Sequence, residues 1–269
     1  MIVTMCPRMS EKKLILILAY ARTGSNYFCG LLGNTFNDIN SNYEIFNKQE
    51  TYINENYIEE MYKKYGNLKD KDVNIFERLG RKKGLLKVSG QNPIKYLENL
   101  IDISREPIIS IKIIKDQLKD NYIKQIINKS NMIIVLDRKF IDIFISLKKI
   151  RKVIKNHLDP WVKIDTTDTQ IHFDNTEYEN EREEYTQWYS KINDLLKHQL
   201  NRDYIKIDYD DFHTQSLKQQ QQYLKEKINN FLQYNLDIIY NITTLNKQDK
   251  SKKYSDKISN YDTFTKYFH

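Results

Sequence analysis

Residues 13–26 read Lys13-Leu14-Ile15-Leu16-Ile17-Leu18-Ala19-Tyr20-Ala21-Arg22-Thr23-Gly24-Ser25-Asn26. The run up to Tyr20 is apolar after its first residue and lacks the three-and-four spacing of a helix, which predicts a strand buried on both faces. Gly24 breaks the run in a small loop, and the apolar residues from about Ser25 to Asn34 predict a helix directly after it. A buried strand, a glycine loop and a helix in this order favour an α/β fold with a parallel sheet.

Later stretches repeat the alternation of strand and helix. Ile108 to Ile114 and Met132 to Asp137 are continuous apolar runs, and Tyr204 to Tyr209 alternates apolar and polar residues, so each predicts a strand. Apolar spacing of three and four predicts helices over residues 92–103, 119–128, 140–156, 177–200 and 215–232. We therefore expect three layers, α/β/α, with a central parallel sheet.

The chain of 269 residues is long enough for one substantial core, so we expect one domain over residues 1–269. Residues 37–105 are polar, with short helices expected at about 53–65 and 73–81, and suit a helical cover over a site. Residues 159–175 predict a second exposed loop or lid. From residue 243 to the end the sequence is Lys-rich without clear periodicity, which is typical of a solvated segment.

Charge and cysteine content narrow the functional classes. A net charge of +7 favours a polyanionic ligand such as nucleic acid, an anionic membrane surface or a phosphorylated nucleotide. Cys6 and Cys29 are the only cysteines, and no His or Cys spacing suits zinc, so neither a disulfide framework nor a structural metal is expected.

The same composition bears on location. No apolar run approaches the roughly 20 residues of a membrane span. Lys12-Lys13, Leu14 to Leu18 and Ala19-Tyr20-Ala21 imitate a signal peptide, but that apolar stretch is at the short limit for one. We therefore expect a cytoplasmic protein in a reducing compartment.

The loop after the first strand is comparable with the nucleotide-binding pattern G-x-x-x-x-G-K-[ST]. Ser25 stands where the Lys of that pattern reaches the outer phosphates, and Asn26 stands where a hydroxyl binds Mg²⁺. Gly24, the helix N-terminus, the hydroxyls of Thr23 and Ser25, and the charge of Arg22 still suit an anion. The alternative is that Thr23-Gly24-Ser25 only turns the chain and caps the helix.

Two patterns in this sequence resemble those of one enzyme family. Strand-Tyr-x-Arg-Thr-Gly-Ser before an apolar helix resembles the 5′-phosphosulfate loop of sulfotransferases that use 3′-phosphoadenosine-5′-phosphosulfate (PAPS), whose fold is similar to that of P-loop NTPases. The strand ending at Asp137, then Arg138, seven residues and Ser146, resembles the 3′-phosphate element of that family. The resemblance implies that the loop binds the 5′-phosphosulfate through Arg22, Thr23, Gly24, Ser25 and Asn26, although a Ser or Thr is more usual at position 26.

For the second pattern, the resemblance implies that Arg138 and Ser146 bind the 3′-phosphate. On the residues alone, Arg138 is a surface Arg near a helix start, and Ser146 bonds its own i−4 carbonyl. Tyr204 to Phe212 resembles the late strand of the family, with more Asp than usual. Lys257 to Asp262 resembles the closing segment of bacterial-type members, which implies that Lys252 or Lys253, just upstream, touches the 3′-phosphate.

Two further residues are catalytic candidates. Glu44 lies before an aromatic pair, as the Glu of many family members does, which implies a general base; the alternative is an ordinary exposed Glu. Lys112 interrupts an apolar strand and must face a cavity or a rim. The resemblance implies that Lys112 stabilises the bridging oxygen or the transferring group, and the alternative is a solvent-facing edge.

The resemblance implies an enzyme that moves a sulfuryl group from PAPS to a hydroxyl or amine, releasing adenosine 3′,5′-bisphosphate. By analogy with phosphoryl transfer, we expect positioning and electrostatics to dominate, in line and without a metal ion. Small molecules, carbohydrates and protein Tyr remain open as acceptors, and we expect no nucleic-acid partner. The alternatives are a nucleotide or nucleoside kinase with a degenerate P-loop, and a non-catalytic binder of nucleic acid or another polyanion.

Overall fold

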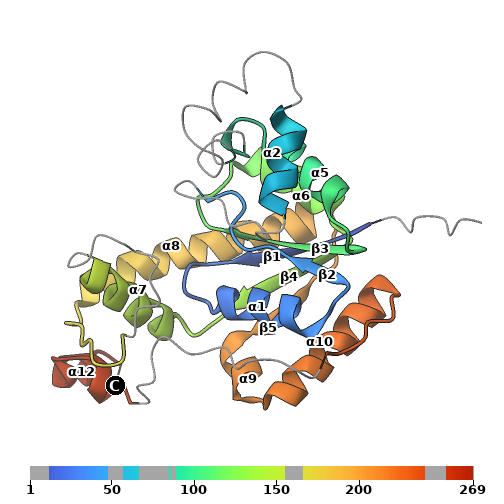
Figure 1. Cartoon of the computed structure of the whole chain (residues 1–269). Helices are drawn as coiled ribbons and strands as arrows, with labels where there is room; N and C mark the ends of the chain where they lie inside the picture. The colour runs from blue at the N-terminus through green and yellow to red at the C-terminus, as the bar shows by residue number, and fades with distance from the viewer. Residues whose placement is uncertain are drawn as a thin grey trace, which may run out of the picture.

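A parallel sheet lies at the centre of the computed structural model, which describes residues 12–47, 57–66, 85, 89–154, 166–239 and 253–268 (Figure 1). Within these ranges the sheet has five strands in the order β2-β3-β1-β4-β5, and every neighbouring pair is parallel. The strands are β1 Lys13–Ala19, β2 Ile39–Ser41, β3 Ile108–Ile114, β4 Met132–Asp137 and β5 Ile205–Asp208.

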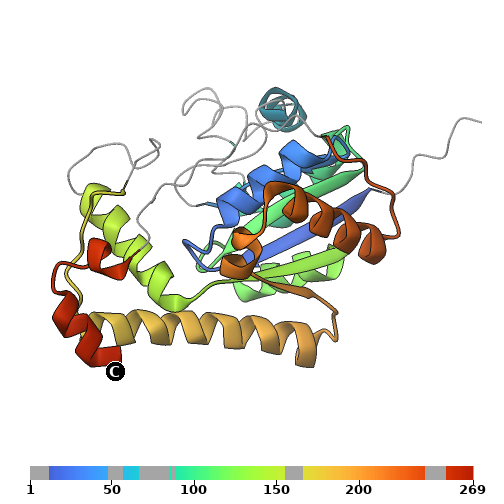
Figure 2. The ribbon, with the colours of Figure 1, turned by 90° about the horizontal axis from the view of Figure 1, so that it is seen from below.

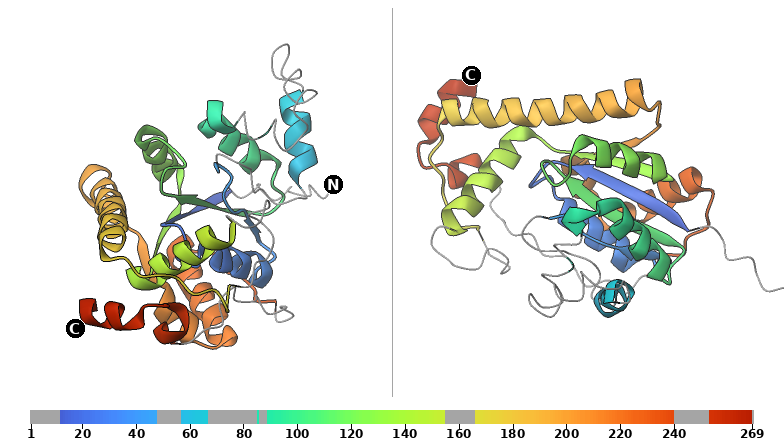
Figure 3. Two further views of the ribbon diagram at one scale, coloured as in Figure 1. Left: turned by 90° about the vertical axis from the view of Figure 1, so that its left-hand side faces the viewer. Right: turned by 90° about the horizontal axis from the view of Figure 1, so that it is seen from above.

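Helices cover both faces of the sheet, because successive side chains of each strand point in opposite directions (Figure 3). In β1, Leu16 packs with one set of helices and Ile17 with the other. One face carries α2 Ile58–Gly66, α5 Pro93–Ile103, α6 Asp120–Lys129 and α8 Asn175–Asn193. The other carries α1 Ser25–Thr35, α9 Tyr209–Thr214 and α10 Leu217–Leu232. The expected three-layer α/β/α architecture is confirmed.

A third group of helices lies beyond the carboxyl ends of the strands (Figure 2). It consists of α7 Phe140–Ile154, the start of α8, α11 Tyr254–Lys257 and α12 Tyr261–Phe268. Phe144, Phe173, Tyr178 and Phe264 form its separate aromatic core. These aromatic contacts hold the C-terminal helices beside the edge of the sheet where the loops gather.

Two sequence expectations for this region hold only in part. Of the exposed loop expected over residues 159–175, residues 159–165 lie outside the described ranges; residues 166–174 are irregular and partly exposed, but Ile171 and Phe173 are buried and Ile171 forms a β-bridge with Ile258. The Lys-rich segment expected from residue 243 is described from residue 253, where it forms two short helices that are largely exposed but bury Ile258 and Phe264. Both segments pack against α7 and α8, and these tertiary contacts stabilise structure that the local sequence pattern does not predict.

The other predicted elements agree with the structure to within a few residues, with three differences. The strand β2 was not predicted, because its three residues are too few to show the alternation of a strand. The helix expected over 177–200 ends at Asn193 and continues as a π-helix, Asp194–Gln199. The third difference is α9, which was not predicted. It begins after β5 because the Asp208 side chain accepts hydrogen bonds from the Asp210 and Asp211 N–H groups. The helix expected at 73–81 lies outside the described residues.

The strand order indicates where a ligand would bind. From β1 the chain passes to β2 and β3 on one side, and then crosses to β4 on the other. Open α/β sheets bind ligands at the carboxyl end of the strands where the order reverses in this way. The loop after Tyr20 lies there. Among the described residues, no helix is long and apolar enough to cross a membrane.

Tyr189 joins α8 to this edge of the sheet. Its hydroxyl donates a hydrogen bond to the Leu136 carbonyl and accepts one from the Tyr20 N–H at 3.2 Å. The hydroxyl therefore satisfies backbone groups at the ends of β1 and β4.

We predict that Tyr189→Phe lowers the free energy of unfolding by about 1–3 kcal/mol, because two backbone groups lose their partner. Tyr261→Phe, at a ring that is 38% exposed, is the control and should change it by less than about 0.5 kcal/mol. Urea unfolding followed by circular dichroism measures both. Equal effects of the two substitutions would contradict the prediction.

Candidate functional site

The loop between β1 and α1 has two residues in the left-handed region, Arg22 at φ 67° and Gly24 at φ 79°. Gly adopts this region readily, whereas a residue with a side chain loses roughly 1–2 kcal/mol there. Thr23 holds the turn, since its buried hydroxyl donates to the Tyr20 carbonyl at 2.9 Å. Alternating φ signs turn successive N–H groups toward one concavity, an arrangement that binds anions.

The N-terminus of α1 continues this concavity. Its first intrahelical bond runs from the Phe28 N–H to the Gly24 carbonyl, so the N–H groups of Ser25, Asn26 and Tyr27 have no partner within the helix. Gly24 is the N-cap residue, no side chain caps the helix, and its first turn has no acidic residue. Thr23-Gly24-Ser25 thus turns the chain and supplies the N-cap residue, as the structural alternative expects, but no hydroxyl of the loop caps α1. The helix presents a positive end that suits an anion.

The two sequence motifs meet at this point. The Arg22 Nε donates to the Ser146 Oγ at 3.0 Å, and the Arg138 Nη1 donates to the Arg22 carbonyl at 3.2 Å. Ser146 is thus bonded to Arg22, and Arg138 reaches the same loop at the Arg22 carbonyl. Ser146 lies roughly 12 Å along the helix axis from Arg138 at ~1.5 Å per residue, and this distance brings it to the loop of β1.

The electrostatics of the loop favour an anionic ligand. Burial lowers the pKa of Arg22, and the nearby charge of Arg138 lowers it further, while Glu44 acts in the opposite direction. An anion bound between the two guanidinium groups would offset both the desolvation and the repulsion.

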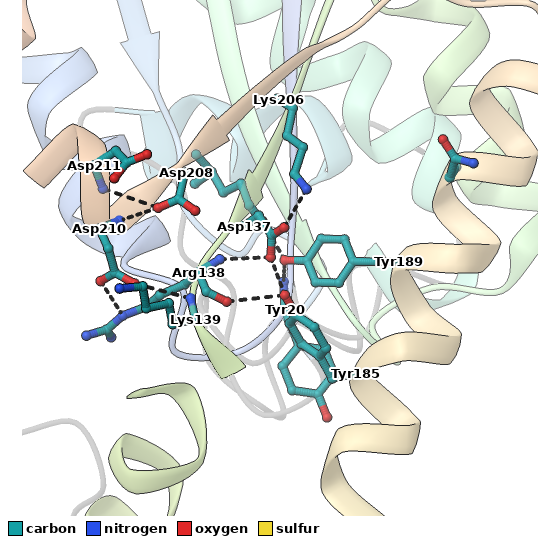
Figure 4. Close-up of polar contacts among 12 residues, drawn as sticks. Tyr20, Asp137, Arg138, Lys139, Tyr185, Tyr189, Lys206, Asp208, Asp210 and Asp211 are labelled. Carbon is teal, nitrogen blue, oxygen red and sulfur yellow. Dashed lines mark hydrogen bonds and ion pairs between the residues drawn. The ribbon is translucent and has the colours of Figure 1, made fainter. Parts of the chain in front are cut away.

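Arg138 is held from several sides (Figure 4). Its Nε donates to the Asp210 Oδ1 at 3.2 Å, and its guanidinium lies over the Tyr209 ring, 5.2 Å from the centroid. Its backbone N–H donates to the Asp137 Oδ1 at 2.8 Å, and the Lys206 ammonium pairs with the other oxygen of Asp137 at 2.7 Å. Among these contacts, the sequence signal for Asp210 was the excess of Asp at the end of the late strand.

A second cluster surrounds Lys112, which is fully buried. Lys112 is level with Ile17 of β1, and its backbone N–H donates to the Tyr43 carbonyl at 3.2 Å, so β3 has no solvent-facing edge at this residue. Its ammonium donates to the Asn26 Oδ1 and, at 2.8 Å, to the Glu44 Oε1. Lys112 thus connects Asn26, at the start of α1, to Glu44.

Glu44 is not an ordinary exposed Glu, since its side chain is 14% exposed and accepts three hydrogen bonds. Besides Lys112, the donors are the Asn47 Nδ2 at 2.8 Å and the Gln117 Nε2 at 3.0 Å. Gln117 is itself oriented, because its Oε1 accepts from the Ile114 N–H at 3.0 Å. Neither amide was predicted from the sequence.

Hydrogen-bonding capacity remains in this cluster. An ammonium has three donors, and Lys112 uses two of them on Asn26 and Glu44. A carboxylate has about four acceptor sites, and Glu44 uses three. Each group can therefore make one further bond to a ligand.

The C-terminal segment approaches the Arg138 end of the site through Tyr254. The Tyr254 hydroxyl donates to the Asp142 Oδ2 at 3.3 Å. Burial and Asp142 raise the pKa of Tyr254, Asp210 adds to the rise and Arg138 opposes it. Lys253 precedes Tyr254 and is exposed, and Lys252 lies outside the described residues.

Among the described residues, neither a reactive thiol nor a metal site is indicated. Burial raises the pKa of the Cys29 thiol to about 11, so this residue of α1 is a poor nucleophile near neutral pH. Within the described ranges, no group of three or more His, Cys, Asp or Glu side chains suits a metal ion.

Gly24 provides a test of the loop geometry. A Cβ there would lie 2.1 Å from the Tyr209 Cε2, in addition to the cost of the left-handed φ. We predict that Gly24→Ala destabilises the fold by at least about 1–2 kcal/mol. Gly90→Ala, where a Cβ meets nothing within 4 Å, is the control and should be neutral or stabilising. Thermal unfolding of the two variants measures the difference, and equal melting temperatures would contradict this geometry.

Comparison of the chain with protein-family models, with curated proteins and with solved structures finds no match. The arrangement of Arg22, Ser146 and Arg138 at one edge of the sheet, with Glu44 and Lys112 beside it, is therefore the basis for a functional proposal.

Proposed function

We propose that the protein transfers a sulfuryl group from PAPS to a hydroxyl or amine of an acceptor. The supporting observation is the meeting of Arg22, Ser146 and Arg138, which come from distant parts of the chain, beside the uncapped N-terminus of α1. PAPS carries anionic groups at its 5′ and 3′ ends, and this site offers positive groups at two neighbouring points.

Arg22 and the N–H groups at the start of α1 neutralise the phosphate that departs when the bond between sulfur and the bridging oxygen breaks. Lys112 directs its remaining N–H at that oxygen or at the sulfuryl oxygens. Glu44 accepts the proton of the acceptor as the new bond to sulfur forms. Arg22 and Lys112 supply the charge that metal ions supply in phosphoryl transfer, so the proposed reaction is metal-independent.

The proposal covers small molecules, carbohydrates and protein Tyr as acceptors, and places the reaction in the cytoplasm. A degenerate nucleotide or nucleoside kinase is the main alternative, but Ser25 stands at the position of the Lys that such enzymes use. A non-catalytic binder of nucleic acid or another polyanion is favoured by the net charge of +7 and the Lys-rich sequence after residue 243, and its affinity for nucleic acid should fall steeply with salt.

We predict that adenosine 3′,5′-bisphosphate binds at least about tenfold more tightly than ATP with Mg²⁺, because the site has a second basic group and lacks the kinase Lys. Isothermal titration calorimetry of the same preparation with each nucleotide measures the ratio. Tighter binding of ATP with Mg²⁺ would overturn the proposed function in favour of the kinase.

For catalysis, we predict that Arg22→Ala lowers the rate of transfer by about 10²–10³-fold, the usual loss for one group that stabilises developing charge. Glu44→Gln should lower it by about 10²–10⁴-fold while leaving binding of adenosine 3′,5′-bisphosphate unchanged. Arg182→Ala, on the exposed surface of α8, is the control and should keep full activity.

The assay uses labelled PAPS and an acceptor found by screening carbohydrates, small hydroxylated metabolites and Tyr-containing peptides. Full activity of Arg22→Ala would refute the donor assignment. Full activity of Glu44→Gln would remove only the assigned base.

A further inference from the structure

Asp210 has a specific position beside the proposed 3′-phosphate site. It lies in the first turn of α9, where the Asp208 side chain caps the helix through the Asp210 N–H at 2.9 Å and the Asp211 N–H at 3.2 Å. One Asp210 oxygen accepts from the Arg138 Nε, and the other accepts from the Lys139 N–H, both at 3.2 Å. The carboxylate is therefore fixed against the end of β4 at both oxygens (Figure 4).

These contacts determine which edge of Arg138 is available. A guanidinium group has five N–H donors. Arg138 uses one, on Nε, for Asp210 and one, on Nη1, for the Arg22 carbonyl. The three that remain belong to the Nη1 and Nη2 atoms, the pair that binds a phosphate through two parallel hydrogen bonds.

The Tyr209 ring adds a cation–π contact, since the guanidinium lies over it at 5.2 Å from the ring centroid. Asp210 and Arg138 are both mostly shielded, with side chains 26% and 22% exposed, so the ion pair is less screened than a surface pair. Asp211, the next residue, is exposed, and no ion pair of its side chain is seen within the described part of the chain.

We propose that Asp210 is a positioning residue, which fixes Arg138 with its Nη edge toward the ligand and thereby makes the site prefer a nucleotide that carries a 3′-phosphate. This inference rests on the proposed function and adds a determinant of donor specificity to it. In the opposite case, Asp210 competes with the ligand for Arg138, and its removal strengthens binding. The two cases are separated by whether substitution of Asp210 weakens or strengthens binding of the nucleotide with a 3′-phosphate.

The experiment measures affinity for adenosine 3′,5′-bisphosphate and for adenosine 5′-monophosphate, with the intact chain, by calorimetry. In Asp210→Asn, we expect the preference for the bisphosphate to fall by about tenfold, the equivalent of one hydrogen bond to a charged group. Asp211→Asn is the matched control, because it removes the same charge from the same helical turn. Its preference should equal that of the wild type.

Asp210→Glu, which restores the carboxylate, should recover part of the preference, whereas a purely structural role predicts equal losses for both nucleotides. An unchanged or increased preference in Asp210→Asn, alongside a clear preference in the wild type, overturns this inference alone. A wild-type chain without any preference overturns the proposed function, and this inference with it. Circular dichroism of each variant confirms that the affinities refer to folded protein.

Discussion

The burial of β1 on both faces is the constraint on which the rest of the structure depends. Its side chains from Leu14 to Ala19 are almost fully buried, and each aliphatic one contributes roughly 1.5–3 kcal/mol on burial. Two layers of helices are needed to supply that burial, and they leave only the ends of the strand accessible. Polar groups that must meet a ligand are therefore concentrated where β1 ends, in the loop that contains Arg22 and Gly24.

The site places charged groups where solvent is scarce. Lys112 is fully buried, and burying a charge costs several kcal/mol unless partners compensate. Glu44 and Asn26 are those partners, and Gln117 and Asn47 in turn hold Glu44. Such a network has little value for stability when apolar residues of the same volume are available, which is why we interpret it as functional.

Local patterns predicted most of the fold. The runs of β3 and β4 were found residue for residue, because a strand buried on both faces is apolar throughout. Elements that tertiary contact creates were missed: β2 is short, and α11 and α12 are ordered by packing on α7 and Phe173. The sequence has no local record of such contacts.

In the candidate site, too, local patterns were predicted and tertiary contacts were not. Glycine spacing and a basic residue after a strand pointed to Arg22 and Arg138, since both lie where strands end. Gln117 was missed, because a single Gln in a loop carries no period or motif. The excess of Asp near Asp210 was visible in the sequence, but its pairing with Arg138 was not, because the two residues are 72 positions apart. The pairing of Ser146 with Arg22 required the direction of α7, which residue spacing alone does not give.

The Tyr209 ring lies close to Gly24 and also under the Arg138 guanidinium. One rigid aromatic side chain thus fixes the distance between the loop and the second basic group. A ligand whose two anionic ends match that distance gains a chelate effect, because its second contact costs little additional entropy. Its affinity would then exceed what its separate halves predict, and the spacing of its charges would matter as much as their number.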